Sequence, residues 1–426
     1  MGSLTTTIVA NARWTFAATA CLLVVACGGG GDGQESANVA PAAMVAGLSA
    51  GAATDMTALG AGRRSESDDR RSATGRCSHY EFTDLGTLGG TQSAAAAVND
   101  SGSVVGYAYL PGDLAAHAVL WAHGRTIDLG TLGGASSYAT DVNDDGKIVG
   151  TSTLADGTSH ATLWSGGKVR DLGAAGGLSS SAEGINDAGQ IVGSAHLGSA
   201  HDVAILWNGK STTQLSPING AVGASPWISS IATDISDKGL IVGQSGTRFY
   251  DDHGATSWTD RNPASLDGLG DSFALGVNNL GTIVGISGAH PGFPGRATVW
   301  TGTTPTLLTG LFADSLGRYE AFANAINDAG QIAGSSATNA NVGAHAVLWN
   351  SSNSAPIDLN NFLDMNAVGA GWVLTSASGI NNKGWIAGQS SNTLTGQSHG
   401  FLLTLVSEPD RGNSSRRPGV FCASDL

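Results

Sequence analysis

The chain has 426 residues, of which 63 are glycine, 13% are charged and 41% are apolar, and its formal net charge is −14. This apolar content with so few charges excludes a disordered chain, and the scarcity of Glu and Lys disfavours long helices, so many short strands joined by Gly-rich turns are expected. The acidic balance is a poor match for a polyphosphate, so we expect no nucleic-acid partner.

Residues 1–27 have the features of an export signal. Arg13 is the only charged residue, and the apolar run from Trp14 to Ala26 is too short to span a membrane. The segment ends in Val-Val-Ala-Cys, which resembles a bacterial lipobox and implies acylation of Cys27. Because Gly28 rather than Asp follows, the resemblance implies an outer-membrane lipoprotein or an extracellular location in a Gram-negative-type envelope. An ordinary secretion signal cleaved nearby is the alternative.

Residues 28–78 are predicted to form a flexible tether. They are rich in Gly, Ala and Ser, contain a mixed-charge patch at 63–72 and show no helical or strand period. A flexible chain of this length spans on the order of 40 Å root-mean-square. The membrane would then be reached through the lipid anchor only.

Residues 79–406 contain seven copies of one unit, which decides the expected fold. The clearest element is Asn-Asp-x-Gly, or a close variant, followed by two apolar residues and Gly. It begins at residues 99, 143, 186, 236, 278, 327 and 381. Consecutive copies therefore start 42 to 54 residues apart, a spacing typical of four-stranded propeller blades.

Each unit divides into four predicted strands. The first strand runs into the Asn-Asp-x-Gly turn, where Asn and Asp bond their own turn and Gly supplies positive φ. The second resembles "QIVGSA", the third "HAVLW", and the fourth ends in Asp-Leu-Gly in several units. We expect the bulky residue that ends strand three to pack between neighbouring blades. It is Trp121, Trp164, Trp207, Trp258, Trp300, Trp349 and, in the seventh unit, Leu403.

The two ends of the array predict a closed ring. The segment 82–90 is a fourth strand with no unit before it, and the seventh unit stops after strand three. An N-terminal strand that completes the last blade would pair both exposed edges. We therefore predict an all-β fold, a seven-bladed β-propeller of four-stranded antiparallel blades. A ring with another number of blades and an open β-solenoid are the alternatives.

Two cysteines lie at the ends of the predicted ring. Cys77 precedes the first strand, and Cys422 lies in the C-terminal tail, residues 407–426. In an oxidising compartment they form an even pair once Cys27 carries lipid, so a disulfide that joins the two ends of the ring is expected. Two free thiols are the alternative.

The motifs "HAVLW", "NDAGQIVG" and "DLGTLGG" together resemble the HAF family of extracellular repeats. The resemblance covers about three-quarters of the chain and implies export and a cell-surface or secreted setting, with no activity attached. Units three to five lack the His and have Asp202, Gly254 and Arg296 near that place. The triplet is His117-Ala118-Val119, His160-Ala161-Thr162, His345-Ala346-Val347 and His399-Gly400-Phe401.

The repeated histidines are expected to be structural. They lie in different blades and cannot converge on one zinc ion, whose ligands lie about 2 Å from the metal; a metal ligand is the alternative to a His that holds a neighbouring loop. The Asn-Asp-x-Gly turns lack the oxygen spacing of a calcium loop. The sequence contains no nucleophile elbow, H-E-x-x-H, P-loop or C-x-x-C motif. We therefore predict no catalytic residue, no metal and no cofactor.

All the variation in loop length falls on one predicted face. Strand direction alternates, so the loops after strands two and four share a face, and binding residues concentrate on such loops. We expect a monomeric binding or scaffold module for a surface glycan or protein; neutral drift of the loops is the alternative. A lyase or hydrolase that acts on polysaccharides in the central channel is the alternative function. The candidate binding residues are Arg248, Tyr250, Asp251, Asp252, His253, Arg318, Tyr319 and Glu320.

Overall fold

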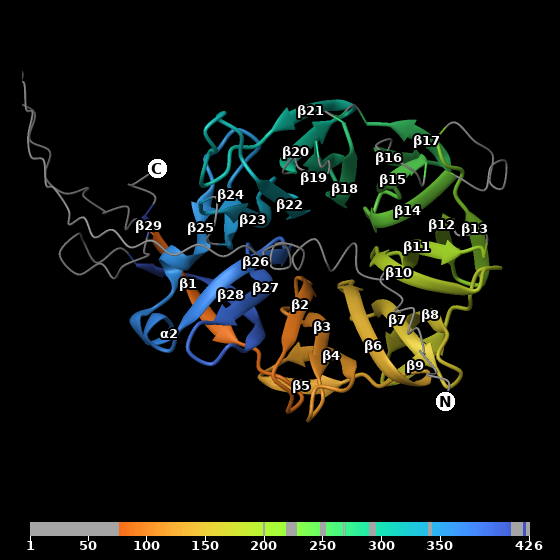
Figure 1. Ribbon diagram of the computed structural model, residues 1–426, viewed down its shortest axis with the longest axis horizontal. Coiled ribbons are helices and arrows are strands. Elements are labelled where there is room, and N and C mark those ends of the chain that lie inside the picture. The colour runs from red at the N-terminus through yellow and green to blue at the C-terminus, as the bar shows by residue number, and fades with distance from the viewer. Residues whose placement is uncertain are drawn as a thin grey trace, which may run out of the picture.

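Seven antiparallel sheets surround a central axis, and this arrangement confirms the predicted seven-bladed β-propeller (Figure 1). The first strand of each blade lies nearest the axis, and the fourth lies at the rim. The computed structural model describes residues 76–198, 201–218, 228–247, 253–266, 268, 270–288, 295–339, 343–409 and 421–422. The predicted signal segment, Cys27 and residues 28–75 lie outside the described residues.

Blades 1 to 4 follow one another in the sequence. They comprise β2 (Ser93–Val98), β3 (Val104–Tyr109), β4 (Ala116–Ala122) and β5 (Arg125–Asp128); β6 (Gly133–Val142), β7 (Ile148–Leu154), β8 (Ser159–Ser165) and β9 (Lys168–Asp171); β10 (Ser179–Ile185), β11 (Gln190–His196), β12 (Asp202–Asn208) and β13 (Ser211–Gln214); and β14 (Ile228–Ile235), β15 (Ile241–Thr247), β16 (His253–Thr259) and β17 (Asn262–Ser265).

Blades 5 to 7 complete the ring. They comprise β18 (Ser272–Val277), β19 (Thr282–Ser287), β20 (Arg296–Thr301) and β21 (Thr304–Leu307); β22 (Ala321–Ile326), β23 (Ile332–Ala337), β24 (Ala344–Trp349) and β25 (Ile357–Asp358); and β26 (Trp372–Ile380), β27 (Ile386–Asn392), β28 (Ser398–Pro409), β1 (Arg76–Asp84) and β29 (Phe421–Cys422). The helices η1 (Leu359–Phe362) and α2 (Met365–Gly369) precede β26. In the described part of the chain, no helix is long and apolar enough to cross a membrane.

The seventh blade is closed by the N-terminal strand, as the sequence predicts. β1 pairs with β28 over its whole length, from Arg76 opposite Pro409 to Asp84 opposite Phe401. β29 adds a short fifth strand on the outer edge of β1. The sheet therefore begins inside the segment assigned to the tether and extends into the segment assigned to the tail.

Glycine in the second strand is required by close approach of two backbones. The first strand of every blade has a β-bulge beside it. A Cβ atom on Gly150 would lie 2.0 Å from the carbonyl oxygen of Tyr138, and the matching glycines give 1.9–2.1 Å. No side chain fits at that distance, which explains the glycine that ends each Ile-Val-Gly or related triplet.

The bulky residue that ends strand three packs against the preceding blade, as expected. Trp164 of blade 2 lies in one cluster with Val105 and Ala118 of blade 1. Trp349 of blade 6 similarly meets Val284 of blade 5 and is fully buried. Leu403 occupies this position in blade 7. At each of these interfaces, the later blade thus contributes one large side chain that packs against the blade before it.

Candidate functional site

The propeller has two chemically different faces. Strands one and three run toward the Asn-Asp-x-Gly turns, and we call this side the turn face. Strands two and four run toward the other side, the loop face, which carries most of the variation in connection length. The prediction that all of it lies there is wrong in one blade: residues 350–356, between β24 and β25 on the turn face, replace the two-residue turn of blades 1 to 5. β1 is a fourth strand and starts at the turn face, and β28 is a third strand and ends there. Both ends of the propeller therefore leave from the turn face.

The predicted binding residues are only partly described. Arg248, Tyr250, Asp251 and Asp252 lie outside the described residues. The backbone of His253 begins β16 opposite Gly246.

The other three candidates share the loop before β22. The guanidinium of Arg318 lies 2.7 Å from Asp314, Tyr319 forms a bridge with Ala313, and the carbonyl of Glu320 accepts the Ala337 NH. The structure thus brings Arg318, Tyr319 and Glu320 together, with the cation engaged by its own loop.

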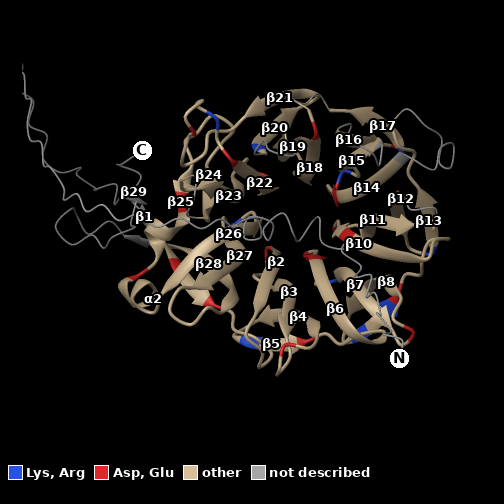
Figure 2. Ribbon diagram, in the orientation of Figure 1, with Lys and Arg blue, Asp and Glu red and all other residues tan. Residues whose placement is uncertain are grey.

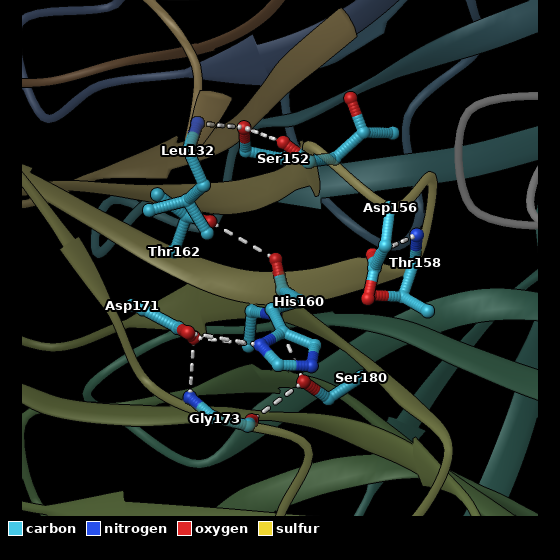
Figure 3. A network of polar contacts seen from close by, with 11 residues as sticks. Leu132, Ser152, Asp156, Thr158, His160, Thr162, Asp171, Gly173 and Ser180 are labelled. Carbon is cyan, nitrogen blue, oxygen red and sulfur yellow. Dashed lines mark hydrogen bonds and ion pairs between the residues drawn. The ribbon is translucent and has the colours of Figure 1, made fainter. Parts of the chain in front are cut away.

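Each repeated histidine forms a pair with an aspartate of the fourth strand in its own sheet. His160 Nδ1 lies 2.9 Å from Asp171 Oδ1, and Figure 3 shows the two side chains pointing toward each other. Because a carboxylate only accepts, Nδ1 carries the proton. The four pairs are His117 with Asp128, His160 with Asp171, His345 with Asp358 and His399 with Asp84.

These pairs belong to a network that joins neighbouring blades. Asp171 also accepts the Gly173 NH, and Ser180 of the next blade donates to the Gly173 carbonyl while accepting the Ala161 NH (Figure 3). The His-Asp pair therefore holds the end of strand four where the following blade is attached. This is the structural role that the sequence predicts, with the strand-four aspartate as the partner.

A covariation within the chain marks this pairing. In the four units with His, the strand-four residue opposite the position two after the His is an Asp. In units three to five the residue at that strand-four position is Gln214, Ser265 or Leu307. In blade 3 the residue at the histidine position is Val203, opposite Ala195, and the preceding Asp202 pairs with His196 on β11 at 3.0 Å. In blade 7 the partner Asp84 comes from β1, so the pattern identifies the closing strand from sequence.

The turn face is organised around the axis by a closed ring of seven hydrogen bonds. In each blade the backbone NH of the second turn residue donates to the side-chain Oδ1 of its counterpart in the next blade, at 2.8–2.9 Å. The bond from Asn382 to Asp100 closes the circle. The ring consists of Asp100, Asp144, Asp187, Asp237, Asn279, Asp328 and Asn382.

A second ring lies one residue earlier in the turn. The side-chain amide of Asn99 donates to the backbone carbonyl of Asn143 in the next blade. Six of the seven blades, including this one, form such a bond, at 2.9–3.1 Å. The fourth blade has Ser236, which carries no amide. The two rings surround an axial pocket of about 170 Å³, and Figure 2 shows acidic residues around the centre of the propeller. The sequence indicates only turn chemistry for these residues, because the bonds that form the rings join residues of different units.

Three further carboxyl groups lie on innermost strands of blades 2 to 4. Asp141 on β6 accepts the Ile185 NH of blade 3, and Asp234 on β14 accepts the Val277 NH of blade 5. Each also accepts the NH of the following residue, so both oxygens of each carboxyl are engaged. Glu183 on β10 accepts from the Ser181 hydroxyl at 2.7 Å. Among the described residues, no group of His, Cys, Asp or Glu is arranged to hold a metal.

These three groups hold protons more tightly than exposed carboxyls do. Burial raises the pKa of Glu183 to about 7, and the Ser181 hydroxyl opposes this. Burial, with the charge of Asp234, raises the pKa of Asp141 to about 7. Burial also raises the pKa of Asp234 to about 6. The uncharged form is favoured because these side chains are enclosed between blades.

We expect the free energy of unfolding to fall as pH rises from 4.5 to about 7. Over this window the unfolded chain loses the Glu183 proton, whose ordinary pKa is 4.5, while the folded chain keeps it. Urea unfolding at pH 5 and pH 8 measures the change. Glu183→Gln should show a smaller pH dependence than wild type. Glu81→Gln, at a side chain 62% exposed, is the control, and an unchanged slope in Glu183→Gln contradicts the expectation.

The loop face carries most of the exposed apolar side chains in the described connections. Six of seven lie there: Leu114 and Leu394 between strands two and three, and Leu178, Leu316, Met365 and Val368 between strands four and one. Only Leu280 lies in a turn-face connection among the described residues. Among the described connections, the loop face is therefore the more apolar of the two faces.

Similarity to known proteins is limited to solved structures. No protein-family model and no curated protein matches this chain. A prolyl endopeptidase has a TM-score of 0.47 and 11% identity, covering 76% of this chain and 51% of its own. A mutant of AofleA from Arthrobotrys oligospora has a TM-score of 0.37 and 11% identity, covering 66% and 88%. The chain spans about half the length of the endopeptidase, and similarity at this level carries no functional information.

Proposed function

We propose that this chain is an exported, lipid-anchored cell-surface repeat protein of the HAF type, whose propeller binds an external glycan or protein through its loop face. The observation that carries the proposal is the distribution of exposed apolar side chains in the described connections, where six of seven lie on the loop face. The sequence candidates Arg248, Tyr250, Asp251 and Asp252 belong to the same proposed surface. The lipid on Cys27 provides attachment, because each buried methylene contributes about 0.8 kcal/mol.

The position of the propeller's ends supports this orientation. β1 enters and β28 leaves at the turn face. A tether from Cys27 therefore joins the propeller on the side opposite to the loop face. An anchored molecule can then direct its variable loops toward an external partner.

The hydrogen bonds on the turn face also favour the loop face as the binding surface. Its central side chains are engaged in the two rings between blades. Side chains used to hold blades together are poorly suited to adapt to a partner. The loop face, by contrast, presents side chains that the blades do not require.

The proposal predicts that two substitutions on the loop face weaken binding. Leu316→Ser with Leu394→Ser should raise the apparent dissociation constant for isolated Gram-negative cell envelopes by about tenfold or more, since truncated apolar anchors cost over 1 kcal/mol. All chains carry Cys27→Ser, so that binding does not come from the lipid. Sedimentation with envelopes measures the bound fraction.

Leu280→Ser is the matched control on the turn face. Leu280, Leu316 and Leu394 are each 72% exposed, so the substitutions differ in face and not in burial. Thermal unfolding checks that all variants fold alike. The proposal fails if the double variant binds as wild type does, or if Leu280→Ser loses as much binding.

A further inference from the structure

Three tyrosines form a cluster where blades 1 and 2 meet. Tyr107 of β3 contacts Tyr138 of β6 with ring centroids 5.2 Å apart and planes at 69°. Tyr109 lies 6.2 Å from Tyr107 at 72°. Both contacts are edge-to-face, the arrangement that aromatic quadrupoles favour. We call Tyr107, Tyr109 and Tyr138 the tyrosine cluster.

The tyrosine cluster belongs to the loop face. Tyr109 is the last residue of β3, which runs toward that face, and the loop that follows it carries Leu114, 94% exposed. Tyr138 lies on the innermost strand of blade 2 and is 39% exposed. The cluster therefore extends from the loop-face end of β3 in blade 1 to the innermost strand of blade 2, where Tyr138 is accessible to solvent.

The cluster is held in place by polar contacts. Ser136, two residues before Tyr138, is fixed by two bonds to the Thr153 side chain, which accepts the Ser136 NH at 3.0 Å and donates to the Ser136 carbonyl at 2.9 Å. The carbonyl of Tyr109 accepts the Gly90 NH. An aromatic surface fixed before binding loses little conformational entropy when a ligand arrives.

The surroundings carry no basic side chain and are rich in hydroxyl groups. The loop-face connections of these blades, residues 85–92, 110–115, 129–132 and 155–158, contain Thr and Gln but no Lys, Arg or His. Their two carboxylates are engaged locally, Asp113 by Thr91 and Asp156 by Thr158. Such a surface offers no attraction to an anionic ligand.

We propose that the tyrosine cluster binds a sugar unit of a neutral polysaccharide. A pyranose ring has an apolar face of C–H groups, which packs on an aromatic ring, and hydroxyls at its edge, which match phenol, Ser and Thr groups. Sites for small ligands typically combine aromatic side chains with a small number of polar groups that orient the ligand. This inference rests on the proposed function and names the ligand class for one part of the loop face.

Affinity electrophoresis of the full chain carrying Cys27→Ser tests the proposal. Native gels contain a neutral β-glucan, xylan or mannan, with polygalacturonate as the anionic comparison. We expect at least one neutral polysaccharide to retard the wild-type chain and polygalacturonate not to do so. Tyr138→Ala should raise the dissociation constant by about tenfold, whereas Tyr138→Phe and the turn-face variant Leu280→Ser should stay within about threefold of wild type.

The outcomes separate this inference from the proposed function. If no neutral polysaccharide retards the chain, or if Tyr138→Ala is retarded as strongly as wild type, the sugar site is overturned. Envelope binding that is lost in the Leu316 and Leu394 double variant but kept in Tyr138→Ala also overturns it, while the loop face stands. Envelope binding abolished by protease treatment of the envelopes would assign the face to a protein partner instead.

Discussion

Deletion of residues 76–84 should abolish cooperative folding of the propeller. The deletion removes β1, which pairs with β28 from end to end. Tyr80, 5% exposed, packs in one cluster with Leu374, Phe401 and Leu403, and its hydroxyl donates to the Gly384 carbonyl. Blade 7 would keep three strands, an open edge and an uncovered apolar surface. Each of these losses alone is of the order of several kcal/mol, against a typical total stability of about 5–15 kcal/mol.

Urea unfolding followed by tryptophan fluorescence measures this effect. The wild-type chain should give a single sigmoidal transition, and the deletion variant should give a broad, shallow one with binding of a hydrophobic dye. Deletion of residues 58–66, which precede β1, is the matched control because it shortens the chain equally. A sharp transition in the variant lacking β1 would falsify closure of the ring by the N-terminal strand.

The second large effect is expected from a disulfide between Cys77 and Cys422. The register of β1 and β29 places these two residues opposite each other. A bridge would link residues at the two ends of the propeller, and in the chain-entropy model a loop of this length contributes roughly 5–6 kcal/mol, an upper figure. We therefore expect reduction of the wild-type protein to lower its free energy of unfolding by several kcal/mol.

Serine variants isolate the contribution of the bridge. Cys77→Ser, Cys422→Ser and the double variant should be equally destabilised, and none should respond further to reductant. Peptide mapping without reduction should recover the linked pair from wild type. Two titratable thiols at these positions in the unreduced, denatured chain would exclude the disulfide.

Much of the fold was predictable because its signals are local. The Asn-Asp-x-Gly turn needs only a side chain that bonds within four residues and a glycine at positive φ; Asn143 accepts from the Lys147 NH, and Gly146 has φ of 74°. The strand-three tryptophan recurs at one register position and packs accordingly. The incomplete first and last units predicted the closure that β1 provides.

The candidate site was predictable in outline only. Alternation of strand direction was enough to assign most of the variable loops to one face, although the connection 350–356 on the other face is also longer than its counterparts. Which side chains that face exposes, such as Leu114, Leu316 and Leu394, depends on packing that no local pattern records. The contact of Tyr107 with Tyr138 was likewise missed, because the two residues belong to different units and to no shared motif.

The sequence by itself determined the repeat, the turn chemistry, the number of blades and the strand that completes the last one. Each of these follows from backbone geometry and hydrogen bonding within a few residues, repeated seven times. Only the tertiary structure decided how the blades are joined around the axis. The bond from Asn382 to Asp100 spans 282 positions, and the aspartate that makes it looks, in sequence, like any other turn residue. Contacts of that separation exist only once the ring has closed and brought its ends together.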